Sequence, residues 1–313
     1  MEGDHMSTTA PIELSAEARA FEDLLAAGAV PATQLEILRS RSERMHGAAS
    51  EPEGVTYREV NANGVPAIWA QPAVANNDFV LLHSHAGGSV TTSAAVDRKL
   101  AGHIATAIGV PALVLDFRRA PEHKYPAQVD DVEAAFDWLV SQGHEPKNII
   151  SIGHSIGGFL ATAVALRLRD AGKPLPGAIV SISPWADLEI ANETIESNAG
   201  TDKLLSRGIL EFFRESWIGG TGIAFDDVRI NLNRADLAGL PPTFVSWGTY
   251  EVLAGEDEEF AGRLKAAGVS TEALPVVGAQ HSYIWAAGRV PETDQAIAKI
   301  AQWVRTTLPI AVR

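Results

Sequence analysis

One stretch decides the fold of this chain: Asn148-Ile149-Ile150-Ser151-Ile152-Gly153-His154-Ser155-Ile156-Gly157-Gly158-Phe159. Its first half is apolar and β-branched and predicts a buried strand, and its second half opens a helix. Between them, Gly153-x-Ser155-x-Gly157 is typical of a nucleophile elbow, where the glycines remove Cβ atoms that would collide with neighbouring elements. Such a turn strains the backbone and presents the Ser155 hydroxyl above the sheet. The N–H of Ile156 would lie beside it at the helix N-terminus, where negative charge is favoured.

On both sides of this stretch, the sequence alternates between strand and helix patterns. The alternation predicts an α/β fold with a mostly parallel central sheet and helices on both faces. Residues 55–70 differ, because two alternating segments flank Asn61-Ala62-Asn63-Gly64 and predict an antiparallel hairpin. The other predicted strands span residues 79–83, 112–116, 178–183, 241–248 and 271–277, and the predicted helices span residues 94–108, 126–142, 257–267 and 293–307.

Two parts of the chain do not follow this alternation. Residues 15–45 predict two amphipathic helices ahead of the first strand, with Phe21, Leu24 and Leu25 on an apolar face and a break at Gly28 and Pro31. Residues 187–230 contain helical patches and a glycine-rich bend, and they are expected to form an insertion above the sheet. A parallel sheet needs neither part, so both are expected to cover something.

Composition limits the class of protein. The 313 residues suffice for one large α/β domain, and the net charge of −14 argues against nucleic acid or an anionic membrane surface as a partner. There is no cysteine, so disulfides and cysteine nucleophiles are excluded. We see no apolar run of about 18 residues and no signal-peptide pattern, and we expect a cytoplasmic protein. Residues 1–6 contain a second Met and resemble vector-derived sequence, so they are excluded from the fold prediction.

A serine nucleophile needs a base and an orienting acid, which follow the serine in this order: acid, then histidine. Of nine histidines, only His281 lies after the elbow, in a loop directly after the last predicted strand. Glu251 follows the preceding strand and is the preferred acid. Asp257 is its main rival, although it lies in an acidic run typical of a first helical turn. Asp236 precedes the strand and is less favoured.

The stretch His83-Ser84-His85-Ala86-Gly87-Gly88-Ser89 follows another strand, and its adjacent glycines would let backbone N–H groups approach an oxyanion. A metal site formed by His83, His85 and His281 is the alternative, but no nearby carboxylate completes it. We therefore expect no metal and no cofactor. His154 is expected to pack locally within the elbow.

Several motifs carry a resemblance to a known family. His85-Ala86-Gly87-Gly88, Asp116-Phe117-Arg118-Arg119-Ala120-Pro121-Glu122-His123 and Gly153-His154-Ser155-Ile156-Gly157-Gly158 occur in the order found in the hormone-sensitive-lipase family of α/β-hydrolases. Ala235 to Pro242 and the run from His281 to Glu292 also fit. Within the family, the chain is most similar to bacterial acetyl-hydrolases and monoterpene ε-lactone hydrolases, in which a Glu similarly occupies the acid position.

The resemblance implies an α/β-hydrolase fold with a helical cap. Residues 7–50 and 187–230 would form the cap over a core of residues 51–186 and 231–313. It implies Ser155 as nucleophile, Glu251 as acid and His281 as base, with oxyanion donors at the N–H groups of Gly87, Gly88 and Ile156. The residues expected to contact substrate are His85, Ala86, His154, Trp185, Phe213 and Trp217.

Two positions depart from the family pattern, and both concern the substrate range. Ala86 replaces a glycine at the mouth of the oxyanion hole, and His154 replaces the usual Asp before the nucleophile. The segment from Asp116 to His123 is interpreted as architectural, with charges that tie its loop beneath the active site.

The expected function is a metal-independent serine esterase or lactonase that acts through an acyl-enzyme. Apolar residues in the cap predict short to medium acyl esters or cyclic terpenoid esters as small-molecule substrates. Lactone-specific hydrolysis is one alternative. A non-catalytic binding protein is another, because plant hormone receptors that resemble this family have lost the catalytic histidine, whereas this chain retains His281. The sequence does not decide the oligomeric state, and a homodimer stays open.

Overall fold

The computed structural model describes residues 14–28 and 35–311, whose strands form one eight-stranded sheet in the order β1-β2-β4-β3-β5-β6-β7-β8. Strand β2 is antiparallel to β1 and β4, and every pairing from β4 through β8 is parallel. The predicted mostly parallel sheet is therefore confirmed. Its strands are β1 (Val55–Ala62), β2 (Val65–Pro72), β3 (Val80–Ser84), β4 (Ala112–Leu115), β5 (Ile149–His154), β6 (Ala178–Ile182), β7 (Thr243–Gly248) and β8 (Thr271–Val276).

The predicted hairpin is formed by β1 and β2. Asn63 and Gly64 occupy its turn with φ angles of 53° and 93°, a left-handed conformation that Asn and Gly tolerate best. The side chain of Asn61 accepts a hydrogen bond from the Gly64 N–H at 2.6 Å. The turn chemistry therefore explains why β2 runs antiparallel to β1.

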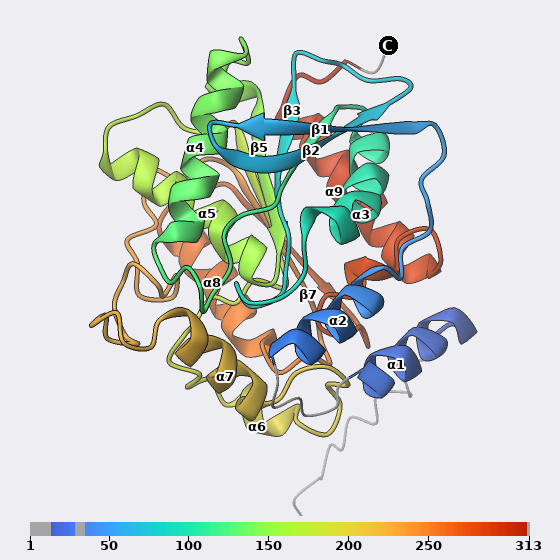
Figure 1. Ribbon diagram of the computed structural model, residues 1–313, viewed down its shortest axis with the longest axis vertical. Coiled ribbons are helices and arrows are strands. Elements are labelled where there is room, and N and C mark those ends of the chain that lie inside the picture. Colours follow the sequence, from blue (N-terminus) through green and yellow to red (C-terminus); the bar gives the residue numbers. More distant parts are fainter. Residues whose placement is uncertain (1–13, 29–34, 312–313) are drawn as a thin grey trace, which may run out of the picture.

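Helices cover both faces of the sheet (Figure 1). One apolar core includes side chains of α4 (Ala127–Ser141), α5 (Ile156–Asp170) and α8 (Ala254–Ala266), and the other includes side chains of α3 (Ala94–Ile108) and α9 (Pro291–Thr307). Helix α8 starts three residues before its predicted start. Two short 3-10 helices, Pro146–Asn148 and Tyr283–Ala286, were not predicted, because single turns are too short to produce periodicity.

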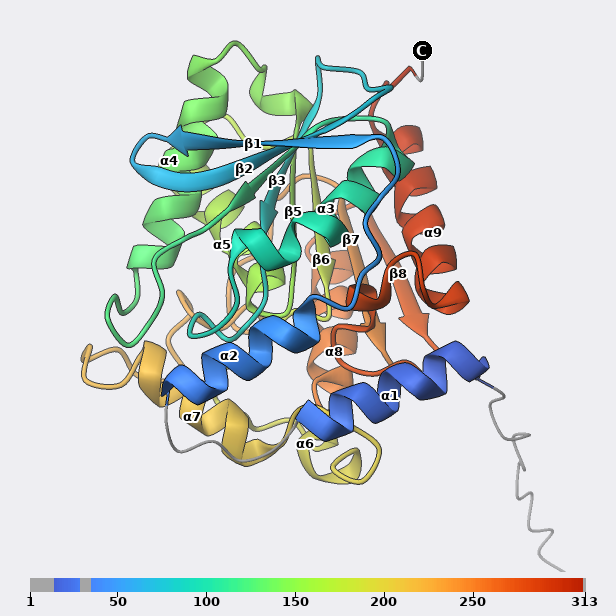
Figure 2. The same ribbon diagram turned by 45° about the vertical axis from the view of Figure 1, so that its right-hand side comes forward.

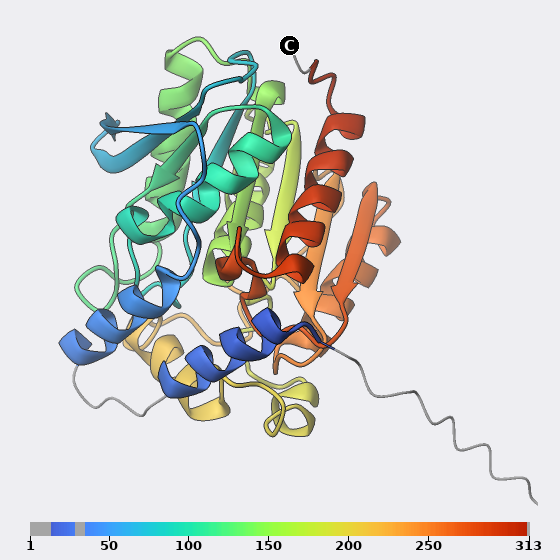
Figure 3. The same cartoon turned by 90° about the vertical axis from the view of Figure 1, so that its right-hand side faces the viewer.

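The remaining helices gather at the carboxyl ends of the parallel strands (Figures 2 and 3). They are α1 (Ala16–Gly28), α2 (Leu35–His46), α6 (Thr194–Ser197) and α7 (Arg207–Trp217). Phe21 and Leu25 of α1 are buried, but Leu24 is 43% exposed, so its predicted place on the apolar face is wrong. The tag-like residues 1–6 and the predicted break at Pro31 lie outside the described residues. Among the described residues, no helix is both long and apolar enough to cross a membrane.

Arg39 ties helix α2 to the core. The Arg39 guanidinium donates to both carboxylate oxygens of Glu122 at 2.7 Å and to the carbonyl oxygens of Val90 and Ala120 at 2.9 Å. The hydrogen bonds from Arg39 lower the pKa of Glu122 to about 2. Glu122 belongs to the segment interpreted as architectural, and this contact shows one of its charges holding a helix at the carboxyl end of the sheet.

Candidate active site

Ser155 lies at the turn between β5 and α5 with φ 56° and ψ −126°, a strained conformation for a residue with a side chain. The turn is tight on both sides. A Cβ at Gly153 would lie 2.2 Å from the carbonyl oxygen of Gly157, and one at Gly157 would lie 2.0 Å from the carbonyl oxygen of Ser84. Only glycine fits at these two positions, which is the physical reason for the motif.

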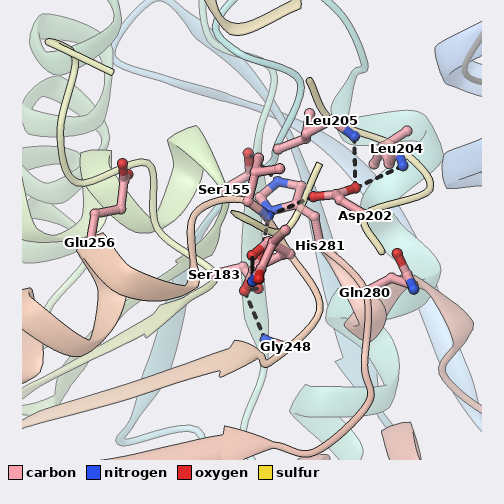
Figure 4. A network of polar contacts seen from close by, with 12 residues as sticks. Ser155, Ser183, Asp202, Leu204, Leu205, Gly248, Glu256, Gln280 and His281 are labelled. Carbon is pink, nitrogen blue, oxygen red and sulfur yellow. Dashed lines mark hydrogen bonds and ion pairs between the residues drawn. The ribbon is translucent and has the colours of Figure 1, made fainter. Parts of the chain in front are cut away.

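His281 meets Ser155 at the carboxyl end of the sheet (Figure 4). Its Nε2 lies 2.9 Å from the Ser155 Oγ, and its Nδ1 makes a short contact with Oε2 of Glu251. Both His281 and Glu251 are almost completely buried. Three residues separated by up to 126 positions are thus joined in one hydrogen-bonded chain, with the imidazole between a hydroxyl and a carboxylate.

The second carboxylate oxygen of Glu251 is also bound. Oε1 accepts hydrogen bonds from the Gly248 N–H at 2.7 Å and from the Ser183 hydroxyl at 3.0 Å. Burial raises the pKa of Glu251, and the adjacent His281 opposes this effect. Because both oxygens accept hydrogen bonds, the carboxylate is held in one orientation toward the Nδ1 of His281.

The two rival acids do not contact His281 in this structure. Asp236 lies on the surface, where its side chain accepts a hydrogen bond from the Ala238 N–H. Asp257 is fully buried in α8, and neither of its carboxylate oxygens has a hydrogen-bond partner in the part of the chain that the structure describes. Burial and the negative charges of Glu251 and Glu256 raise the pKa of Asp257 well above its ordinary value.

Replacing Asp257 is expected to change the pH dependence of stability. A raised pKa means that the folded protein binds a proton that the unfolded chain has lost, so this stability is present below pH 3.8 and is lost as pH rises. Asp257→Asn removes the ionisation, and the Tm difference between variant and wild type should increase by at least about 2 °C from pH 4 to pH 8. Thermal unfolding at several pH values measures it. The exposed neighbour change Glu258→Gln is the control, and an equally flat profile for both variants would contradict the argument.

The glycine stretch after β3 lies beside the nucleophile. Gly87 and Gly88 have φ angles of 96° and 60° and line the same cavity as Ser155. Among the described residues, no backbone or side-chain acceptor bonds to either N–H. A Cβ at Gly88 would come within 2.5 Å of the Phe213 ring, so this aromatic side chain lies directly over the loop. Two backbone N–H groups without an acceptor among the described residues thus belong to residues that line the cavity next to Ser155.

A cavity of about 320 Å³ extends from Ser155 to the helices at the carboxyl end of the sheet. Its walls come from four parts of the chain: the end of α1, α2, the segment through α7, and the loops and 3-10 helix of the core. Most of the lining is apolar, but hydroxyl groups and one guanidinium also take part, so the prediction of an apolar pocket holds for only part of the wall. The cavity is lined by Gly28, Leu38, Arg41, Ser42, Met45, Gly87, Gly88, Thr91, Ser155, Leu204, Leu205, Ser206, Gly208, Ile209, Phe212, Phe213, His281 and Trp285.

Of the six residues expected to contact substrate, Phe213 is among the lining residues of this cavity. Trp217 is fully buried and donates its indole N–H to Gln128 at 2.7 Å, and Trp185 is buried as well. Ala86 is buried in the loop that carries Gly87. These side chains shape the surroundings of the cavity instead of its wall.

The three histidines of the alternative metal site do not converge. The His85 ring stacks on Phe117 with centroids 4.0 Å apart, and its Nδ1 lies 2.7 Å from the Thr92 hydroxyl. Burial lowers the pKa of His85 to about 4, so the ring is neutral at neutral pH. His83 and His154 instead meet at Asp97, a carboxylate that the sequence did not connect with them.

Two other residues near the site were not predicted from the sequence. Asp202 is buried and accepts hydrogen bonds at 2.8 Å from the N–H groups of Leu204 and Leu205 (Figure 4). It also accepts one at 2.8 Å from the N–H of Val252, the residue after Glu251. Asn198 donates to the carbonyl oxygen of Glu251 at 2.9 Å. The insertion therefore supports the loop that carries the acid. Nothing in its sequence pattern signals this, because the contacts cross about 50 residues.

Comparison with known proteins gives a consistent result. A family model described as alpha/beta hydrolase fold matches residues 81–285. The chain is 33% identical to an acetyl-hydrolase of Streptomyces hygroscopicus over 86% of this chain and 88% of that protein. It is 30% identical to an esterase of Acinetobacter venetianus over 74% of this chain and 76% of the relative. The crystal structure of an esterase from the bacterial hormone-sensitive lipase family is similar, with a TM-score of 0.90 at 33% identity, covering 95% of this chain and 99% of that one.

Proposed function

Because the chain belongs to the α/β-hydrolase fold family and resembles its bacterial hormone-sensitive-lipase members, we propose that it hydrolyses carboxylic esters. The observation that carries this proposal is the hydrogen-bonded chain from Ser155 through His281 to Glu251 at the end of a cavity. Relatives called acetyl-hydrolase and esterase support the same reaction class. Serine is the nucleophile in this proposal, and no metal or cofactor is required.

In the first half of the reaction, the Ser155 Oγ attacks the ester carbonyl carbon while the Nε2 of His281 accepts the hydroxyl proton. The carbonyl π electrons move to oxygen, and the N–H groups of Gly87, Gly88 and Ile156 stabilise that oxyanion. Glu251 holds the imidazole in the required tautomer and stabilises the imidazolium. The oxyanion then collapses, and His281 returns the proton to the departing alcohol, which leaves an acyl group on Ser155.

In the second half, water replaces the alcohol. His281 removes a proton from water as the water oxygen attacks the acyl carbon, and the same N–H groups hold the second oxyanion. Collapse breaks the bond to Ser155, whose oxygen recovers the proton, and the acid leaves. A lactone follows the same steps, except that the alcohol stays attached to the acyl group as a hydroxyacyl-enzyme.

The cavity supports a proposal for the substrate class. Its volume of about 320 Å³ and its largely apolar wall suit short to medium acyl groups with apolar alcohols. We infer that α1, α2 and residues 187–230 act as a cap, because α2 and the segment through α7 supply wall residues such as Met45 and Ile209. The cap would bury the substrate on the side opposite Ser155.

A substrate panel tests the proposal. Purified protein should hydrolyse p-nitrophenyl acetate and butyrate with a kcat/KM of about 10⁴ M⁻¹ s⁻¹ or more, and p-nitrophenyl dodecanoate more slowly. Lactones of increasing ring size, followed in a pH-stat, show whether ring esters are preferred over linear ones. Protein that is folded but hydrolyses neither esters nor lactones would show that the function is not ester hydrolysis.

A further inference from the structure

Directly beneath the elbow, three side chains from three elements form a buried cluster. The Nε2 of His83 in β3 lies 2.5 Å from Oδ2 of Asp97 in α3, and the Nε2 of His154 in β5 lies 3.0 Å from the same oxygen. No member is more than 1% exposed. None of them takes part in the reaction steps above, so the cluster needs its own explanation.

The hydrogen bonds define the charge state of this cluster. An ionised Asp97 can only accept hydrogen bonds, so each imidazole facing it must carry its proton on Nε2, and neither Nδ1 has a partner among the described residues. Burial alone would raise the pKa of Asp97, but His154 and His83 more than offset it and hold that pKa well below its ordinary value. Burial lowers the pKa of His154. Asp97 is thus an anion in the first turn of α3, where the helix dipole also favours negative charge.

A metal ion fits this geometry poorly. Two ligand atoms bound to one Zn²⁺ at about 2.0 to 2.1 Å in a tetrahedron lie about 3.3 Å apart, which exceeds the 2.5 Å and 3.0 Å found here. Metal-binding histidines also donate their second ring N–H to a partner, whereas both Nδ1 atoms have none among the described residues. The distances and the unpartnered nitrogens therefore match direct hydrogen bonds.

The cluster joins the two strand ends that carry the proposed catalytic groups. His154 immediately precedes Ser155, and His83 lies two residues before His85 at the start of the glycine loop. Strands β3 and β5 are neighbours, with Ser84 beside Gly153 in the register. The ring of Trp285, which lines the cavity, lies edge-on to His154 with centroids 5.5 Å apart. A shift at Asp97 would therefore reach the nucleophile and the oxyanion loop together.

We propose that Asp97, with His83 and His154, is a positioning network that sets the distance between the Ser155 Oγ and the N–H donors of Gly87 and Gly88. This inference rests on the proposed ester hydrolysis. Attack requires the hydroxyl and the oxyanion donors in one geometry, and a displacement of about 1 Å can lower a rate about 100-fold. The network acts on the chemical step, so substrate affinity should change little.

The test compares three variants on p-nitrophenyl butyrate. Asp97→Asn keeps the shape of the side chain but cannot accept from both rings at one anionic oxygen. His154→Phe keeps a ring but removes the N–H, and His154→Gln can still donate to Asp97. We expect kcat to fall about 10- to 100-fold in Asp97→Asn and His154→Phe, with KM within about threefold, and His154→Gln to recover most of the rate. The rate of Ser155 labelling by a fluorophosphonate should fall in parallel with kcat.

A matched control separates positioning from stability. Ser151 lies on β5 as well and donates a buried hydrogen bond to the Ala161 carbonyl at 3.0 Å, so Ser151→Ala should lower Tm but leave kcat unchanged. The double variant Asp97→Asn/His154→Phe should lose no more than the stronger single variant, because both remove the same contact. If His154→Phe does not fold, Asp97→Asn and His154→Gln still decide the question.

Several outcomes would contradict the proposed positioning role of this network. A folded Asp97→Asn with wild-type kcat and labelling rate refutes it and leaves the ester hydrolysis intact. A stoichiometric metal ion in wild-type protein that is absent from Asp97→Asn would make the cluster a metal site instead. Wild-type protein that is neither labelled nor active on any ester would refute the proposed function together with the network that rests on it.

Discussion

Ser155→Ala is expected to lower kcat for p-nitrophenyl butyrate by at least about 10⁴-fold, the largest effect of any single change in this chain. The change removes the only hydroxyl within hydrogen-bond distance of the Nε2 of His281 among the described residues, so no acyl-enzyme can form. The cavity walls and the proposed oxyanion donors stay in place, and the variant should therefore still bind substrate. Initial rates give kcat, and the binding of a slowly reacting ester, followed separately, gives the affinity for substrate.

Mass spectrometry provides a control for this variant. A fluorophosphonate should add once to the wild-type protein, at Ser155, and not at all to Ser155→Ala. Circular dichroism and Tm establish that the variant is folded. If Ser155→Ala retained more than about 1% of the wild-type kcat, a water or another side chain would have to act as the nucleophile, and the proposed mechanism would be wrong.

Local chemistry explains how much of the fold could be predicted. Each parallel strand is a short apolar run bounded by turn residues, and each covering helix has its own periodicity, so these elements follow from neighbouring residues alone. The start of α8 was missed by three residues because the helix begins at Ala254, before the acidic run that signals a first turn. The spatial order of the strands depends on packing between distant segments, so it cannot be predicted from the sequence of any single segment.

The candidate site divides in the same way. Ser155, Glu251 and His281 could be predicted because each lies at the end of a strand, and parallel strands bring such ends together. Asp97 could not, because a carboxylate within a helix has the appearance of an ordinary first-turn residue. Its pairing with His83 and His154 depends on how α3 lies against the sheet. The prediction that His154 packs locally is wrong, because its partner Asp97 lies 57 positions away in the sequence.

The cavity wall was the least predictable part. Trp217 and Phe213 lie on one amphipathic helix, four residues apart, and both carry large apolar side chains. Phe213 faces the cavity over Gly88, whereas Trp217 extends toward Gln128 in the core. Periodicity identifies the apolar face of α7, but the tilt of the helix over the sheet decides which of its residues lines the cavity.

Glu251→Gln is expected to lower kcat by about 10³- to 10⁴-fold, although glutamine has almost the same shape. The Gly248 N–H donates to Oε1 of Glu251 and would repel an amide NH₂ at that position, so the amide oxygen should remain there. The NH₂ group then faces the Nδ1 of His281 and forces the ring proton onto Nε2. In that tautomer His281 cannot accept the Ser155 proton, which is why the loss should be large.

The pH profile and a second variant test this reasoning. Raising the pH cannot restore the rate of Glu251→Gln if His281 is held in the wrong tautomer. A loss of rate caused only by weaker basicity of His281 would instead give a pH–rate profile shifted from that of the wild type. Asp257→Asn is the matched control, because Asp257 is a buried carboxylate on the adjoining helix that makes no contact with His281 in the structure, and its kcat should stay within about threefold of wild type. If Glu251→Gln were active and Asp257→Asn were not, the acid would have to be reassigned to Asp257. The orientation imposed by Ser183 and Gly248 would then have no catalytic purpose.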